Sequence, residues 1–135
     1  MALLTWGEQY SVGVKTMDSQ HTVLFEMLNN LHAAMKTGQG QSLTGPLLGK
    51  LLEYTRAHFT AEEGMMAASK YPGLTDHRNQ HRALIKQVED YSARYEQGEI
   101  ALNLHLLNFL RDWLTNHIQR EDREYGPWLT EHGVR

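Results

Sequence analysis

Histidine is abundant in this chain, and several histidines lie at spacings that suit a metal site. Eight of the 135 residues are histidine, the commonest protein ligand for transition metals. His77 and His81 are four residues apart, so on a helix both imidazoles project from one face and can bind a single ion. Such a pair alone is more often structural, but His58 and Glu62 repeat the spacing. Because the chain contains no cysteine, any metal must be held by nitrogen and oxygen ligands.

Three further residues extend this group of candidate ligands. His21 and His117 lie on the apolar stripes of two other segments, and burying so many imidazoles without partners would be costly unless a metal binds them. Asp122 follows His117 by five residues, which is an offset of about 140° on a regular helix. Both side chains can reach one site only if the helix widens or ends between them. We therefore predict a π-type bulge or a helix end at this point.

The elements that must position these residues are helical. Apolar residues recur every three or four positions, most regularly through Leu74, His77, His81, Leu84 and Val88, and no segment alternates with a period of two. Glycine and proline separate the helical segments, at Gly38–Gly40, at Tyr71-Pro72-Gly73, at Gly98 and, near the end, at Gly126-Pro127. The pattern predicts an arm at 1–15, helices at about 16–37, 44–69, 74–96 and 99–120, and a tail at 121–135.

The expected fold is all-α. Short connections make sequential helices antiparallel, which predicts an up-down-up-down four-helix bundle, with Pro46 in the first turn of the second helix. Trp6 and Tyr10 are expected to anchor the extended N-terminal arm across the bundle. A short C-terminal helix or tail should follow the last long helix. With 135 residues, a single domain covering 1–135 can bury a continuous core.

Composition excludes several classes of protein. Hydrophobic residues make up 41% and charged residues 21%, which is ordinary for a soluble globular chain. A net charge of −3 argues against nucleic-acid binding, which needs an excess of Lys and Arg. No run of apolar residues is long enough to span a membrane, and the first residues lack the basic and apolar regions of a signal peptide. We expect a cytoplasmic monomer.

Four short segments together resemble the hemerythrin family: DSQH ending at His21, HFTAEE at 58–63, HRNQH at 77–81 and HIQRED at 117–122. The resemblance covers nearly the whole chain, and the length and the arm are similar to the bacterial branch. It implies reversible dioxygen binding, not catalysis, at two oxo- or hydroxo-bridged non-haem iron ions. His77, His81 and His117 would bind one iron, His21 and His58 the other, and Glu62 and Asp122 would bridge them. By family position, the dioxygen pocket would be lined by Leu24, Phe59, Trp113, Leu114 and Ile118.

The stoichiometry of this ligand set has its own consequence. Two metals cannot share five imidazoles equally. With two bridging carboxylates and one bridging hydroxide, the iron with three histidines has six ligands and the iron with two histidines has five. The second iron therefore keeps an open position, which a small ligand such as dioxygen requires.

The sequence excludes one alternative function and leaves several others open. A ferritin-like di-iron enzyme needs Glu-x-x-His motifs, and the sequence contains none. A sensor of oxygen or nitric oxide, a weak oxidase or peroxidase, a zinc protein and a metal-free bundle stay open, and no oxygen-consuming partner enzyme can be identified. His32, His105 and His132 are given no ligand role. Glu63 is expected to be solvated or paired with a base, and Gly64 to weaken its helix locally.

Overall fold

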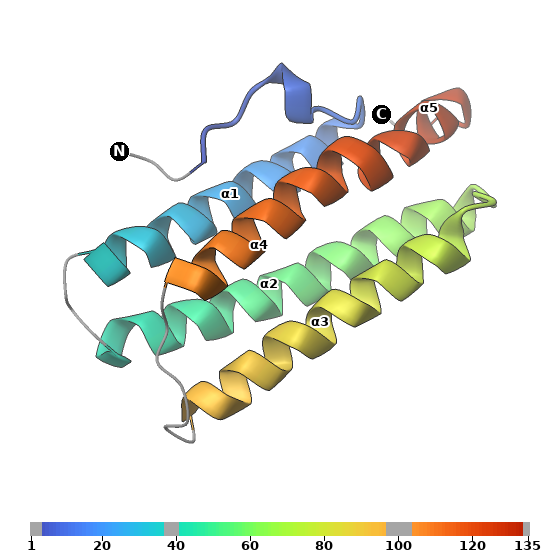
Figure 1. Cartoon of the computed structure of the whole chain (residues 1–135). Helices are drawn as coiled ribbons and strands as arrows, with labels where there is room; N and C mark the ends of the chain where they lie inside the picture. The colour runs from blue at the N-terminus through green and yellow to red at the C-terminus, as the bar shows by residue number, and fades with distance from the viewer. Residues whose placement is uncertain (1–3, 37–40, 97–103, 134–135) are drawn as a thin grey trace.

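The structure is a computed structural model that describes residues 4–36, 41–96 and 104–133. Four long helices lie side by side and alternate in direction, as the colours of Figure 1 show. Helix α1 packs against α2 and α4, and α2 packs against α3. The all-α bundle with an N-terminal arm is therefore confirmed. The long helices are α1 (Lys15–Lys36), α2 (Gln41–Ala68), α3 (Leu74–Glu96) and α4 (Leu104–Asn116).

The helices form the bundle because each one buries an apolar stripe. On α1, Leu24, Phe25, Leu28 and Leu31 recur at three- and four-residue intervals and are at most 2% exposed. The other helices contribute mainly leucine, valine, methionine and phenylalanine to the same core. The ligand candidates occupy positions on these buried stripes, so the packing that stabilises the bundle also fixes their direction. None of the described helices is long and apolar enough to cross a membrane.

The N-terminal arm is held by aromatic packing and by polar contacts. Both predicted anchors pack on Phe25 of α1, with ring centroids 5.3 Å from it for Trp6 and 5.0 Å for Tyr10. The Leu4 backbone N–H donates to Asn29 Oδ1, and Asn29 Nδ2 donates to the Leu4 carbonyl, both at 2.8 Å. A short 3₁₀ turn, Glu8–Tyr10, shapes the arm. The anchoring role expected of Trp6 and Tyr10 is therefore confirmed.

The C-terminal region contains a short helix, which is one of the two alternatives that the sequence predicts. After α4, a π-helical turn (His117–Asp122) leads directly into α5 (Arg123–Glu131), so most of the predicted tail is a short helix. The prediction of a break at Gly126-Pro127 is wrong, because both residues lie inside α5. Gly126 is needed for close packing, since a Cβ atom there would lie 2.0 Å from the Val12 carbonyl oxygen of the arm.

Two other predicted boundaries differ from the structure or fall outside it. Helix α2 already begins at Gln41, before the predicted position 44, so Pro46 lies inside the helix and not in its first turn. The turn predicted at Tyr71-Pro72-Gly73 does separate α2 from α3. The breaks predicted at Gly38–Gly40 and Gly98, and the start of the last long helix at 99, lie outside the described residues.

Replacement of Gly126 by alanine should destabilise the protein. The new methyl group would push the Val12 backbone away from α5, at a cost of about 1–3 kcal/mol, typical of overpacking. Gly64→Ala is the matched control, because Gly64 is exposed within α2 and a Cβ atom there would meet nothing within 4 Å. Thermal unfolding followed by circular dichroism should show a lower Tm for Gly126→Ala and an unchanged or higher Tm for Gly64→Ala. Equal Tm values would contradict the packing argument.

Candidate metal centre

All of the predicted ligands meet in the interior of the bundle. They form two groups, each with ligand atoms within 4.8 Å of one another, and the groups have Glu62 and Asp122 in common. Every ligand candidate is at most 5% exposed. The larger group contains His77 and His81 of α3 and His117 of the π-helical turn, and the smaller contains His21 of α1 and His58 of α2.

The Glu62 carboxylate lies between the two histidine groups, with one oxygen toward each. Its Oε2 atom is 3.3 Å from His21 Nε2 and 3.5 Å from His58 Nε2. Its Oε1 atom faces the other group, 3.4 Å from His81 Nε2 and 3.9 Å from His77 Nε2. One carboxylate can therefore contribute a donor atom to each of two neighbouring ions.

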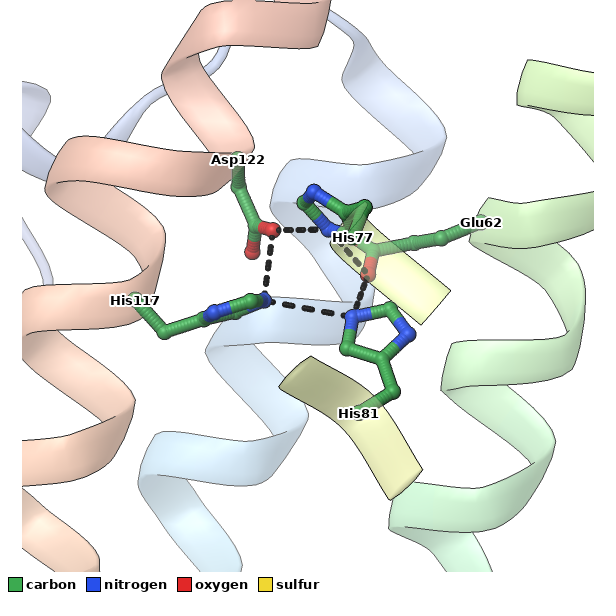
Figure 2. A group of neighbouring side chains, drawn as sticks. All are labelled: Glu62, His77, His81, His117 and Asp122. Carbon is green, nitrogen blue, oxygen red and sulfur yellow. Dashed lines mark hydrogen bonds and ion pairs between the residues drawn. The ribbon is translucent and has the colours of Figure 1, made fainter. Parts of the chain in front are cut away.

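Asp122 has the same arrangement on the opposite side of the site. Its Oδ2 atom is 3.1 Å from His21 Nε2. Its Oδ1 atom is 2.9 Å from His77 Nε2 and 3.0 Å from His117 Nε2 (Figure 2). Both carboxylates thus separate a group of three imidazoles from a group of two.

The π-helical turn is what brings Asp122 to the site. Residues His117–Asp122 form this wide turn, and His117, Ile118 and Asp122 are buried in it. On a regular helix the two ligand candidates would point in directions about 140° apart. The π-type bulge that the five-residue spacing predicts is therefore confirmed, and it lies at a functional site, where such bulges are common.

The two carboxylates are ionised although they are buried. Burial and the nearby charge of Asp122 act to raise the pKa of the Glu62 carboxyl, but the surrounding histidines outweigh them and hold the pKa well below its usual range. Burial acts in the same direction on Asp122, and His117, His21 and His77 likewise hold its pKa well below the usual range. The interior of the bundle therefore holds two negative charges that need a positive partner.

The histidines supply part of that positive charge as protons. Burial acts to lower the pKa of His21, but hydrogen bonds with Asp122 and Glu62 outweigh it and raise the pKa to about 10. For His58, burial dominates and lowers the pKa to about 4, which leaves the ring neutral. A proton on His21 Nε2 uses the same lone pair that would bind a metal, so metal binding must release it.

Unsatisfied polar atoms indicate that the site fits a metal better than protons. Glu62 Oε1, Asp122 Oδ1 and His77 Nε2 are buried and have no hydrogen-bond partner. The 2.9 Å approach of His77 Nε2 to Asp122 Oδ1 lacks the alignment of a hydrogen bond. A cation between these atoms would satisfy all of them at once, and imidazole with carboxylate is a donor set that first-row transition metals such as iron accept.

Two residues next to ligands hold other ligands in place. His81 Nδ1 lies 2.9 Å from Glu63 Oε2, and His58 Nδ1 lies against Gln20 Oε1. Each contact places the ring proton on Nδ1, so Nε2 carries no proton and faces the site, where His81 Nε2 lies 3.2 Å from His117 Nε2 (Figure 2). Glu63 also accepts a hydrogen bond from Arg78 Nε at 3.0 Å, so its predicted pairing with a base is confirmed, but its contact with His81 was not foreseen. The adjacency of Glu63 to Glu62 and of Gln20 to His21 was the only signal for these roles.

Tyr125 is a third supporting residue that sequence reasoning missed. Its side chain is fully buried, and its hydroxyl donates a hydrogen bond to Glu62 Oε2. Burial, together with the charges of Glu62 and Asp122, raises the pKa of the Tyr125 hydroxyl well above its usual value, so the proton stays on the oxygen. No spacing argument could place Tyr125 at the site, because it follows the π-helical turn, where the regular helical phase is lost.

An apolar cavity of about 40 Å³ lies within the bundle, and none of the ligand candidates lines it. Leu24, Phe59, Trp113 and Leu114 line it, whereas Ile118, also predicted for the pocket, is buried but does not. The remaining lining is aliphatic apart from Thr55. Phe59 stacks on His81 with ring centroids 3.6 Å apart, and Trp113 stacks on His117 at 4.3 Å, so the cavity wall directly supports two ligand candidates.

His32 and His132, which have no predicted ligand role, belong to neither group. His32 is half-buried on α1. His132 is exposed, and its Nδ1 atom lies 2.7 Å from the Trp128 carbonyl oxygen. The side chain of His105 is outside the described part of the chain.

Replacement of Tyr125 by phenylalanine should weaken the site without changing its volume. The variant leaves Glu62 Oε2 without its hydroxyl donor, which should lower the free energy of unfolding of the metal-free protein by about 1–3 kcal/mol. Chemical denaturation would measure the change. Tyr54→Phe is the control, because it removes the same hydroxyl group from a half-buried tyrosine. Tyr54 lies on α2, about two turns before Glu62. An equal effect of both variants would contradict a specific role for Tyr125.

Comparison with known proteins agrees with this geometry. Residues 12–129 match the family model described as the hemerythrin HHE cation-binding domain. Curated relatives include a bacteriohemerythrin of Methylococcus capsulatus, 36% identical over 96% of this chain and 99% of its own length. A bacteriohemerythrin of Stenotrophomonas maltophilia is 35% identical over 98% of this chain and 85% of its own length.

A solved structure extends the likeness to three dimensions. The crystal structure of a wild-type hemerythrin superimposes with a TM-score of 0.92 at 35% identity, covering 96% of this chain and 99% of that one. The match to the family model, at residues 12–129, contains all the ligand candidates and most of α5. The chain belongs to the hemerythrin family.

Proposed function

We propose that this protein binds dioxygen reversibly at a di-iron centre. The observation that carries the proposal is the pair of buried carboxylates, each with one oxygen toward a group of three imidazoles and the other toward a group of two. His77, His81 and His117 would bind one iron, His21 and His58 the second, and Glu62 and Asp122 would bridge them. Membership in the hemerythrin family supports iron as the metal.

The inequality of the two groups provides room for a ligand. Because both carboxylates are shared, the ion beside His21 and His58 receives one protein donor fewer than its neighbour. A small molecule can use the position that this leaves open. Two ferrous ions bound by these residues would supply the two electrons that dioxygen accepts and would recover them on its release.

The surrounding side chains favour binding over further reaction. Leu24, Phe59 and Trp113 present an apolar wall beside the imidazoles, which keeps water and its protons away from the site. The donor set is rich in imidazole, and the chain has no Glu-x-x-His motif of the kind found in di-iron oxygenases and oxidases. We therefore propose a binding protein and not an enzyme.

One spectroscopic experiment tests this function directly. The iron-loaded protein would be reduced under nitrogen, exposed to oxygen and then degassed while its visible absorption is recorded. Reversible binding predicts an absorption band that appears with oxygen and disappears on degassing through repeated cycles. A band that never appears, or steady consumption of oxygen with an added reductant, would rule out the proposal.

Removal of individual ligands should remove iron. His77→Ala and Glu62→Ala each take donor atoms from the buried cluster, and we expect both variants to lose most of their iron while remaining helical. His132→Ala should retain the full complement, because His132 is exposed and bonded to the Trp128 carbonyl. Colorimetric iron analysis together with circular dichroism would measure both properties. Iron retention in the first two variants would refute the assignment.

Metal removal should lower the thermal stability of the whole bundle. The ligands come from α1, α2, α3 and the π-helical turn, so ions bound only by the folded state stabilise all of these elements together. We expect a chelator to lower Tm and ferrous iron to restore it. Differential scanning calorimetry at several chelator concentrations would measure the shift, and a Tm independent of iron would contradict the proposed site.

A further inference from the structure

Two ligand histidines have hydrogen-bond acceptors of different charge. His81, in the group of three imidazoles, donates its Nδ1 proton to the Glu63 carboxylate at 2.9 Å. His58, in the group of two, donates its Nδ1 proton to the neutral amide oxygen of Gln20. The Gln20 oxygen must be the atom that faces His58, because a metal on Nε2 requires the proton to be on Nδ1.

The charge of the acceptor changes how strongly an imidazole donates electrons. An imidazole whose N–H bonds to a carboxylate is a stronger ligand than one bonded to an amide. A stronger donor stabilises the more positive oxidation state of its metal. The contacts with Glu63 and Gln20 therefore act in the same direction but with different strength, and the ferric state is favoured more at the three-histidine position than at the two-histidine position.

We propose, on the basis of the function proposed above, that Glu63 is a positioning residue that makes the two irons electronically unequal. Through His81, it stabilises the ferric state of the iron beside His77, His81 and His117. The neutral Gln20 leaves the iron with the open position easier to return to the ferrous state. Dioxygen release requires both irons to return to the ferrous state, and the neutral acceptor eases that return at the position where dioxygen would bind.

The Glu63 side chain is held in place for this role. Its second carboxylate oxygen accepts a hydrogen bond from Arg78 Nε at 3.0 Å, and the side chain is 20% exposed. Phe59 stacks on His81 with an interplanar angle of 1°, so the ring is fixed by its face and by its Nδ1 atom together. Glu63 also lines a surface groove, whose other charged residues are Arg56, Arg82, Lys86 and Glu89. Of the two acids in this groove, Glu63 is the one that contacts the ligand candidate His81.

The decisive variant is Glu63→Gln, which keeps an acceptor for His81 but removes its charge. We expect iron content to be unchanged and the three-histidine iron to become about tenfold easier to reduce, which is about +59 mV for one electron. Spectroelectrochemical titration would measure the potential, and Mössbauer spectroscopy would show which iron has shifted. Glu63→Ala, which removes the acceptor entirely, should also release iron to a chelator about 10–100-fold faster.

Glu89→Gln is the matched control. Glu89 lines the same groove and carries the same charge, but its partner is Arg56 and not a ligand. We expect its midpoint potential to equal that of the wild type. If Glu89→Gln shifts the potential as much as Glu63→Gln, or if Glu63→Gln shifts nothing, the proposal is overturned.

The reverse variant tests the other side of the site. Gln20→Glu should make the two-histidine iron harder to reduce. The shift in midpoint potential should be opposite in sign to that of Glu63→Gln and should appear on the other Mössbauer component.

Failure of this inference can be told from failure of the proposed function. Unchanged potentials in a protein that binds dioxygen reversibly would overturn only the role of Glu63. The expected shifts in a protein that does not bind dioxygen would overturn only the function.

Discussion

The structure depends on two carboxylates that are ionised in the interior of a helical bundle. Isolated, either would cost several kcal/mol to bury, and the cost is offset only because imidazoles from three helices and a wide turn surround them. The rest of the architecture follows from this requirement. The helices must align so that Glu62 and Asp122 meet, and the core must hold this alignment without polar groups of its own.

The supporting residues show how this alignment is kept. Gln20, Glu63 and Tyr125 each bond to a ligand candidate by a polar atom that does not itself enter the site. Gln20 precedes the ligand candidate His21, and Glu63 follows Glu62. In each case, the helix that directs one residue into the site places its sequence neighbour against a histidine of the adjacent helix. The same helical turns therefore supply both the ligand candidates and two of the residues that hold them in place.

The sequence predicts the parts of the fold that obey a regular period. Helical spacing identified His58 with Glu62 and His77 with His81, and the irregular spacing of His117 and Asp122 predicted the π-helical turn. Beyond this turn the period no longer applies, so Tyr125 was missed. Gly126 was misinterpreted as a helix break. A glycine is needed there because the Val12 backbone packs against it, and this contact joins residues far apart in the sequence. Roles that depend on contacts between helices, such as that of Glu63, need the structure.

Phe59 and Trp113 belong at once to the cavity wall and to the support of the ligands. Each ring lies flat against an imidazole, His81 or His117, while its other atoms border the apolar space. A smaller side chain at either of these two positions would therefore enlarge the space and also remove the support of an imidazole. The size of the apolar space and the orientation of two ligand imidazoles are therefore coupled through these two rings, so neither property can be tuned there without altering the other.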